Sequence, residues 1–109
     1  PSVVVVIKRD GRRQPFDASK TRLGVEITLA DRPIAHDAVD DLIATVERAA
    51  YTSQGSIHAD EIGRIVLDGL RDLDEVGYLR FASVYKEFQT ASDFEKAAAK
   101  FDAEVEPAE

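Results

Sequence analysis

The apolar positions of the chain begin with one short continuous run and then follow the period of helices. Residues 3–7 form a run of β-branched residues that is too short for a helix and favours a strand. Asp10 and Gly11 follow as a turn signal, because glycine adopts positive φ without steric cost. Residues 12–16 predict a returning strand, with Pro15 at an edge or at the strand end. The pattern therefore predicts a small N-terminal β-hairpin.

The segment after the hairpin predicts a helix that begins at the N-cap Asp17 and stops before Pro33, because the residue before proline is pushed out of the helical region. Its predicted apolar stripe consists of Leu23, Ile27 and Ala30. A second helix is predicted over residues 36–50. Its stripe consists of Val39, Leu42, Ile43 and Val46. Residues 51–56 predict a loop.

Three more helices complete the predicted architecture. The third begins near residue 59 or 60 and is expected to bury Ile62, Ile65, Val66 and Leu70. The fourth is predicted over residues 75–88, with Leu79, Ala82 and Phe81 or Tyr85 on its apolar face. Ser92 and Glu95 form a capping-box pattern that opens the last helix. The stripe of that helix consists of Phe94, Ala98, Phe101 and Val105.

The predicted fold class is therefore α+β: a small N-terminal β-hairpin packed on a four-helix bundle over residues 3–90, followed by a C-terminal amphipathic helix and tail over residues 91–109. The stripe of the last helix either docks on a partner chain or folds back on its own domain. Both alternatives stay open at this point.

Charge is distributed unevenly along the chain, whose formal net charge is −7. Residues 1–20 carry a net charge of +3, whereas residues 21–109 carry a net charge of −10. A cationic corner on an acidic body suits a compact polyanion better than a long nucleic-acid backbone. From charge alone, a hairpin whose basic side chains are merely solvated is the alternative explanation.

The composition narrows the chemistry further. The chain contains no cysteine, which removes thiolate catalysis and the usual structural zinc sites, and its two histidines show no ligand spacing. None of the common phosphate-loop, dinucleotide, zinc-protease or serine-hydrolase motifs occurs. No segment is long and apolar enough for a membrane span or has the form of a signal peptide. We therefore expect a cytoplasmic protein that is not an enzyme.

The remaining candidate for chemistry is the basic turn followed by a capped helix. Lys8 and Arg9 enter a tight turn at Gly11, and both the turn and the helix N-terminus supply backbone N–H groups suited to phosphate. Lys20 lies in the first helical turn, where a cation opposes the helix dipole. An anion between the lysine and the helix terminus would remove this conflict. Taken as a single residue, however, Lys20 is better explained as a freely solvated lysine.

These residues carry a resemblance to a known domain. The segments Ile7-Lys8-Arg9-Asp10-Gly11 and Pro15-Phe16-Asp17, with Lys20 three residues later, resemble the opening of ATP-cone domains. ATP-cones are allosteric nucleotide sensors of ribonucleotide reductase large subunits and of a family of bacterial repressors, and they consist of a β-hairpin and four helices. Residues 70–88 and 31–34 look very like the repressors, the NrdR family of ribonucleotide reductase transcriptional regulators. The resemblance covers residues 5–94.

The resemblance implies a binding site for ATP or dATP with Mg²⁺. Lys8 and Arg9 match nucleotide-contacting positions, and Lys20 is expected on the phosphates. The implied site as a whole comprises Val6, Ile7, Lys8, Arg9, Asp10, Gly11, Gln14, Asp17, Lys20, Ile62, Tyr85 and Lys86. Within it, Val6, Ile7 and Ile62 are expected near the base, Gln14 and Asp17 at the base or sugar, and Tyr85 and Lys86 at the closure of the pocket or at a second nucleotide.

The chain departs from the family pattern at two places. Where relatives often carry basic residues after Lys20, this chain retains only Arg22 and otherwise has Thr21, Leu23, Glu26 and Ile27. This difference affects how many phosphates, or how many nucleotides, it can hold. NrdR proteins also place a four-cysteine zinc ribbon before the cone, and the ribbon contacts DNA. The present residues contain no cysteine, so we expect no zinc in this chain and DNA binding only through a ribbon that the chain lacks.

The resemblance implies a homo-oligomer whose packing changes with the bound nucleotide, as the sensing part of a repressor of ribonucleotide reductase genes. The expected repacking surfaces are the helix with Phe94 and Phe101 and the face with Tyr78, Phe81 and Tyr85. The regulatory ATP-cone of a ribonucleotide reductase large subunit is the alternative. A protein–protein adaptor with a vestigial pocket is a third possibility.

Overall fold

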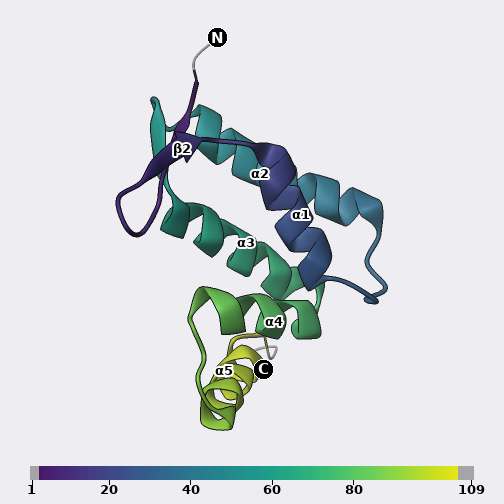
Figure 1. The fold of residues 1–109 in the computed structure, drawn as a ribbon. Coiled ribbons are helices and arrows are strands. Elements are labelled where there is room, and N and C mark those ends of the chain that lie inside the picture. Colours follow the sequence, from purple (N-terminus) through teal and green to yellow (C-terminus); the bar gives the residue numbers. More distant parts are fainter. Residues whose placement is uncertain (1–2, 106–109) are drawn as a thin grey trace.

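The strand β1 (Val5–Ile7) is the centre of a three-stranded sheet in the computed structural model, which describes residues 3–105 and side chains up to residue 103. It pairs antiparallel with β2 (Arg13–Pro15) and parallel with β3 (Ser56–His58), so the sheet order is β2-β1-β3 (Figure 1). The predicted hairpin is confirmed. The third strand replaces the end of the predicted loop, because three residues with only one buried side chain are too short to show a period.

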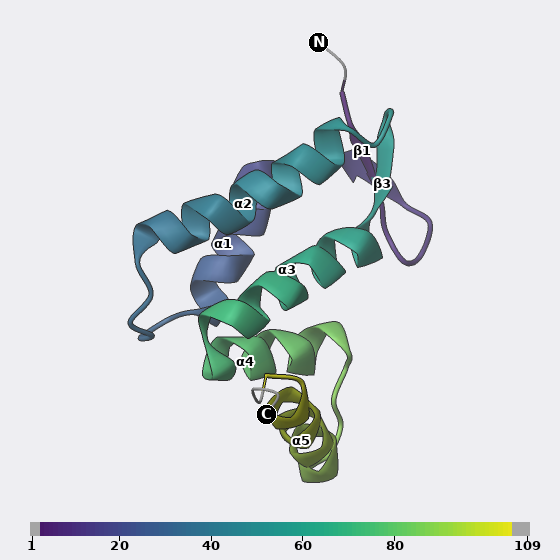
Figure 2. The same ribbon diagram turned by 180° about the vertical axis from the view of Figure 1, so that it is seen from behind.

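Five helices follow the hairpin and its connections. They are α1 (Ala18–Thr28), α2 (His36–Tyr51), α3 (Ala59–Leu73), α4 (Glu75–Tyr85) and α5 (Ala91–Val105). The first three extend away from the sheet, and α4 lies across the far ends of α1 and α3 with α5 beyond it (Figures 1 and 2). The α+β class of a small sheet with a helical body and a C-terminal helix is thus confirmed.

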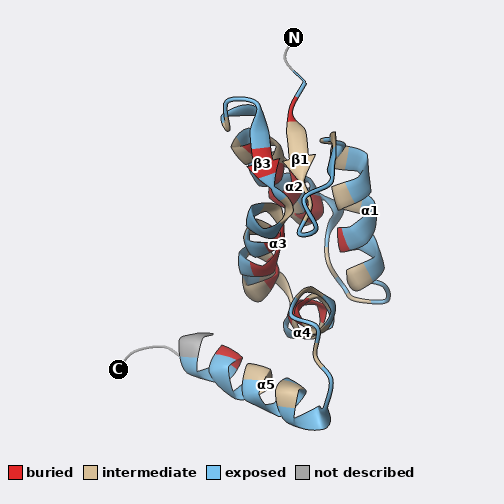
Figure 3. Ribbon diagram, turned by 60° about the vertical axis from the view of Figure 1, so that its left-hand side comes forward, coloured by how far each residue is buried: buried red, intermediate tan, exposed pale blue. Residues whose placement is uncertain are grey.

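The main core lies between the helices and contains buried side chains from all five of them (Figure 3). Its most deeply buried large side chains are those of Val25, Val46, Val66 and Leu70. A smaller cluster of Val4, Ala50 and Ile57 joins the sheet to the end of α2. The predicted stripe of α2 is confirmed at all four positions.

The predicted stripe of α1 is wrong. Val25 and Leu29 face the core, whereas Leu23 and Ile27 are 58% and 66% exposed, and Ala30 lies exposed after the helix end. Two apolar rows lie on this helix, each with four-residue spacing, so periodicity could not decide which row turns inward. The packing of α1 against the other helices determines which of the two rows is buried.

The predictions for α3 and α4 hold in part. Val66 and Leu70 are buried, while Ile62 and Ile65 are only half-buried against the core, and the buried Leu67 was not predicted. Likewise, Ala82 is buried, whereas Leu79, Phe81 and Tyr85 are half-buried. The helix α4 ends at Tyr85 instead of residue 88, because Glu87 adopts a positive φ of 55° that no helix tolerates.

The last helix packs on its own domain through α4. Phe101 is 7% exposed and its ring lies 5.2 Å from that of Tyr78, while Phe94 meets Phe88 edge-on at 5.0 Å between ring centroids. Tyr78 and Phe101, which the sequence placed on the expected repacking surfaces, are buried within the domain. The side chain of Val105, also placed in the predicted stripe, lies outside the described side chains.

The cap of α5 also differs from the prediction. The backbone N–H of Asp93 donates to Thr90 Oγ1 at 3.3 Å, and Asp93 Oδ2 accepts from the backbone N–H groups of Gln89 and Thr90. Thr90 and Asp93 therefore form the reciprocal cap that was assigned to Ser92 and Glu95. The helix begins one residue before Ser92, which places the serine inside the first turn.

The start of α4 is fixed by the carboxylate of Asp74, whose side chain is only 9% exposed. Asp74 accepts two hydrogen bonds from the guanidinium of Arg32, at 2.8 and 3.0 Å, and one from the backbone N–H of Gly77 at 2.8 Å. These contacts, with that of Arg32 the strongest, hold the pKa of Asp74 below its usual value. The carboxylate thereby ties the α1–α2 connection to the α3–α4 junction.

We expect Asp74→Asn to lower the free energy of unfolding by about 2 kcal/mol at neutral pH, because asparagine can still cap α4 but cannot form the ion pair. The pKa of Asp74 is depressed in the folded state, so its contribution is complete above the unfolded pKa of about 4 and is lost as pH falls through the folded value. Urea unfolding at several pH values should therefore show the wild type and variant converging in acid. The exposed Asp72→Asn is the control, and an equal loss in both variants would contradict this account.

Candidate functional site

A hollow of about 200 Å³ lies where β1, β2 and the N-terminus of α1 meet the first turn of α3. The β1–β2 pairing brings Val6 opposite Gln14, and the chain then passes through Phe16 into the capped helix. Six residues that the sequence assigned to the site line this hollow together: Val6, Lys8, Gln14, Asp17, Lys20 and Ile62. Sequence positions 56 residues apart are thus brought to one place.

The hollow combines an apolar wall with two lysines. Phe16 and Ile62 are half-buried in it beside Val6, which gives a flat apolar surface suited to an aromatic ring system. Among the described residues, neither Lys8 nor Lys20 has an acidic oxygen within 4 Å. The two ammonium groups are therefore available to an anion.

The capping residue Asp17 supplies the negative charge nearest to the helix terminus. Its carboxylate accepts hydrogen bonds from the hydroxyl of Ser19 at 2.6 Å and from the Ser19 backbone N–H at 3.0 Å. These bonds, the hydroxyl contact first, lower the pKa of Asp17. Asp17 is therefore ionised at neutral pH and occupies part of the helix terminus that the sequence suggested for phosphate.

A second hollow of about 310 Å³ adjoins the first and shares Lys8 and Ala59 with it. Its lining also includes Arg9, Asp10, Arg12, Asp60 and Tyr85. The first hollow alone is smaller than the roughly 300–1,000 Å³ typical of small-molecule sites. A nucleotide-sized ligand would therefore extend across Lys8 from one hollow into the other.

The structure separates two residues that the sequence placed near the same base. Neighbouring residues of a strand point to opposite faces, so Ile7 lines a different hollow of about 330 Å³ with Gly11 and His58. Only Val6 shares a hollow with Lys20. Lys86, also assigned from the sequence, is the exposed C-cap residue of α4.

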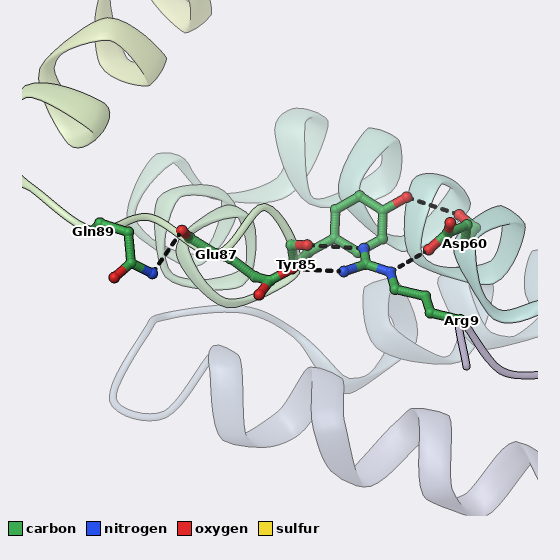
Figure 4. Close-up of polar contacts among 5 residues, drawn as sticks. All are labelled: Arg9, Asp60, Tyr85, Glu87 and Gln89. Atoms are coloured by element: carbon green, nitrogen blue, oxygen red, sulfur yellow. Dashed lines mark hydrogen bonds and ion pairs between the residues drawn. The ribbon is translucent and has the colours of Figure 1, made fainter.

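Arg9 connects the basic turn to two distant helices, as Figure 4 shows. Its Nε donates to Asp60 Oδ1 at 2.6 Å, and its other nitrogens contact Glu87 Oε2 at 3.3 Å and the backbone oxygen of Tyr85 at 2.9 Å. The guanidinium also lies 5.0 Å from the centre of the Tyr85 ring. We call this set of contacts the Arg9 latch. The hydrogen bond to Asp60 comes first among the causes that raise the Arg9 pKa.

Tyr85, the last residue of α4, also contacts α3. Its hydroxyl donates to the backbone oxygen of Asp60 at 2.9 Å, and its ring lies against Gly63, where a Cβ atom would overlap the ring carbon Cε1. The ring of Phe81 stacks on the ring of Tyr85, with 5.8 Å between the ring centroids. The glycine at position 63 therefore allows the close approach of α4 to α3 beside the site.

The turn offers fewer free backbone N–H groups to an anion than its sequence indicated. Gly11 has the expected positive φ of 89°, but its N–H donates to the backbone oxygen of Lys8 at 2.9 Å. The N–H of Arg12 donates to Asp10 Oδ1 at 3.0 Å, and this bond leads the contacts that lower the pKa of Asp10. Side-chain cations must therefore make most contacts to any phosphate bound here.

Asp60 and Glu87 belong to the site although the sequence did not assign them to it. Asp60 is an acidic residue in the first turn of a helix, which is its ordinary place and gives no functional signal. Glu87 reaches Arg9 only because α4 ends just before it and the chain turns. No pattern along the chain could have found a contact between positions 78 residues apart.

Two negative findings concern the described residues 3–105. They contain no group of three His, Asp or Glu side chains placed to hold a metal ion. No helix in this part of the chain is long and apolar enough to cross a membrane.

Comparison with known proteins identifies the domain. The family model for the ATP cone domain matches residues 4–91, and the chain therefore belongs to the ATP-cone family. Among curated proteins it is similar to transcriptional repressor NrdR of Rhodopseudomonas palustris strain BisB5, with 43% identity over 94% of the chain and 65% of the relative. The same protein of Thermomicrobium roseum is 43% identical over 88% of the chain and 60% of the relative. The chain thus spans about three fifths of the length of these relatives.

We expect Gly63→Ala to destabilise the fold by about 1–3 kcal/mol, because the added methyl group displaces the Tyr85 ring and opens the Arg9 latch. Alanine stabilises a helix by about 1 kcal/mol relative to glycine. The same substitution is therefore expected to stabilise the fold where the added Cβ atom meets no neighbour. Gly24→Ala is the matched control, since a Cβ on this helical glycine meets nothing within 4 Å. Thermal unfolding should give a lower Tm than the wild type for Gly63→Ala and a higher Tm for Gly24→Ala. A higher Tm in both variants would show that the Tyr85 ring moves aside without cost.

Proposed function

We propose that the chain is the ATP- and dATP-sensing domain of a transcriptional repressor of ribonucleotide reductase genes, with residues 3–90 as the sensor and residues 91–109 as its C-terminal helix and tail. The family membership and the similarity to proteins named transcriptional repressor NrdR support this proposal. In this role the chain regulates and does not catalyse. DNA contact would require a part of the protein outside these residues.

One observation carries the proposal for the site: two lysines with no acidic oxygen of the described residues within 4 Å flank an apolar hollow at a helix N-terminus. An adenine base fits an apolar wall such as that of Val6 and Ile62, and Gln14 offers an amide for its polar edge. Lys20 and Lys8 would then neutralise phosphates, with Arg12 on the adjoining side. Asp17 would limit how closely a phosphate approaches the helix end.

The Arg9 latch suggests how binding could reach the rest of the domain. Arg9 is already held by Asp60 and Glu87, so a triphosphate that attracts the guanidinium would compete with both carboxylates. Release of these contacts would loosen the junction between the turn, α3 and the end of α4. Nucleotide binding could in this way favour one packing of the domains over another, provided that the ligand has different affinities for the two assemblies.

Calorimetry with ATP and with dATP tests the site directly. We expect Lys20→Ala to weaken binding at least about tenfold, because a charge-assisted contact to phosphate contributes roughly 1.5–3 kcal/mol. Lys100→Ala, which removes an exposed lysine from α5, should leave the affinity unchanged.

The comparison is meaningful only if both variants unfold at the wild-type temperature. The absence of heat with either nucleotide at tens of micromolar wild-type protein would overturn the proposed function. Equal losses in Lys20→Ala and Lys100→Ala would show instead that the nucleotide does not use this hollow.

A further inference from the structure

Thr21 differs from the other threonines of the described helices in the contacts of its hydroxyl group. Thr28 and Thr45 each donate a hydrogen bond to the backbone oxygen four residues earlier, at 3.0 and 3.1 Å. Such a bond is an ordinary way in which a helical threonine satisfies its hydroxyl group. The hydroxyl of Thr21 forms no hydrogen bond within residues 3–105, and its oxygen reaches the surface. This group is therefore available to a ligand.

Thr21 lies in the deeper part of the hollow that forms the candidate nucleotide site. Lys20 and Asp17 line the same hollow but are exposed at its rim, whereas Thr21 is half-buried. The cation of Lys20 thus lies at the mouth, with the apolar wall and Thr21 behind it. Besides Thr21, the half-buried lining residues are Val6, Lys8, Gln14, Phe16, Ala59 and Ile62.

Only Gln14 and Thr21 contribute neutral polar side chains to this half-buried lining. The side-chain amide of Gln14 also has no hydrogen-bond partner within the described part of the chain. Lys8 can donate hydrogen bonds but cannot accept them. Asp17 can accept them, but its carboxylate is already held by Ser19 at the rim. A ligand group that donates hydrogen bonds deep in the hollow would therefore find its side-chain acceptors at Gln14 and Thr21.

An adenine ring placed on the apolar wall presents such a donor. Its exocyclic 6-amino group carries two N–H bonds beside ring nitrogens that accept hydrogen bonds. The amide of Gln14 can pair with both kinds of group, and the hydroxyl oxygen of Thr21 can accept from the second N–H. The phosphates would extend toward the exposed ammonium group of Lys20, away from the half-buried Thr21.

We propose that Thr21 is a specificity-determining residue of the candidate site, whose hydroxyl oxygen accepts a hydrogen bond from the 6-amino group of adenine. This contact rests on the proposed function, which places the base on the wall formed by Val6 and Ile62. A site that hydrogen-bonds a ligand group discriminates against the analogue without that group, because a protein polar group is then left unpaired. Thr21 therefore favours adenine nucleotides over purine nucleotides that lack the amino group.

Calorimetry with ATP and with purine riboside 5′-triphosphate, which lacks only the 6-amino group, tests the contact. We expect Thr21→Val to weaken ATP binding about three- to tenfold, because it removes one hydrogen bond and keeps the shape of the side chain. The affinity for purine riboside triphosphate should stay unchanged. Equal losses with the two nucleotides, or no loss with ATP, would overturn the proposal.

A comparison of ATP with dATP separates a contact to the base from a contact to the sugar. The two nucleotides share adenine and differ only in the 2′-hydroxyl group. Thr21→Val should therefore weaken the binding of both by the same factor. A loss confined to ATP would place the hydroxyl of Thr21 at the ribose, which contradicts the contact with the 6-amino group.

Thr28→Val is the matched control. It makes the same substitution in the same helix, at a half-buried threonine whose hydroxyl bonds to the backbone of Gly24 and which does not line the hollow. It should leave all three affinities unchanged. Thr21→Ser keeps a hydroxyl group and should retain the preference for ATP over purine riboside triphosphate. Loss of this preference in both Thr21→Ser and Thr21→Val would show that the hydroxyl is not its source.

The stability of Thr21→Val identifies an indirect effect. The variant should keep the wild-type Tm, because no hydrogen bond within the described residues is lost. A lower Tm together with equal losses for every nucleotide would assign Thr21 a purely structural role and overturn the proposal.

Lys20→Ala separates failure of this contact from failure of the site. If Lys20→Ala weakens ATP binding and Thr21→Val does not, the nucleotide uses the hollow and only the Thr21 contact is wrong. If the wild-type chain binds neither ATP nor dATP, the proposed function fails and the Thr21 contact fails with it.

Discussion

The pairing of β1 with two partners is the constraint on which the rest of the structure depends. Antiparallel pairing with β2 sends the chain into α1 beside Val5, and parallel pairing with β3 places the start of α3 beside Ile7. The first turns of both helices therefore line one hollow together with Val6 of β1. Every residue of the candidate site is positioned by this junction, by the turn that precedes β2 or by the end of α4.

Electrostatics at this junction divides the basic residues into two groups. Arg9 is held by Asp60 and Glu87 and therefore stabilises the contact between the turn and the two helices. Lys8 and Lys20 lack such partners in the described chain and face a partly apolar hollow. An acidic body with a few uncompensated cations in one place favours a small polyanion, because the surrounding negative charge opposes extended phosphate backbones.

The helix α1 connects this site to the surface. Its inner side joins the core through Val25 and Leu29, its first turn carries Lys20, and its outer side exposes Leu23 and Ile27. A single short helix thus borders the core, the candidate pocket and an open apolar strip.

The sequence by itself determined the hairpin, the order of the helices, the cap at Asp17 and the stripe of α2, because each depends on neighbours within a turn or two. Through the ATP-cone resemblance, the sequence also identified most of the residues that line the candidate hollow. Only the tertiary structure decided which row of α1 is buried, that Ser56–His58 joins the sheet, and that Asp60 and Glu87 hold Arg9. These features depend on contacts between residues far apart in the chain, where periodicity and propensity carry no information.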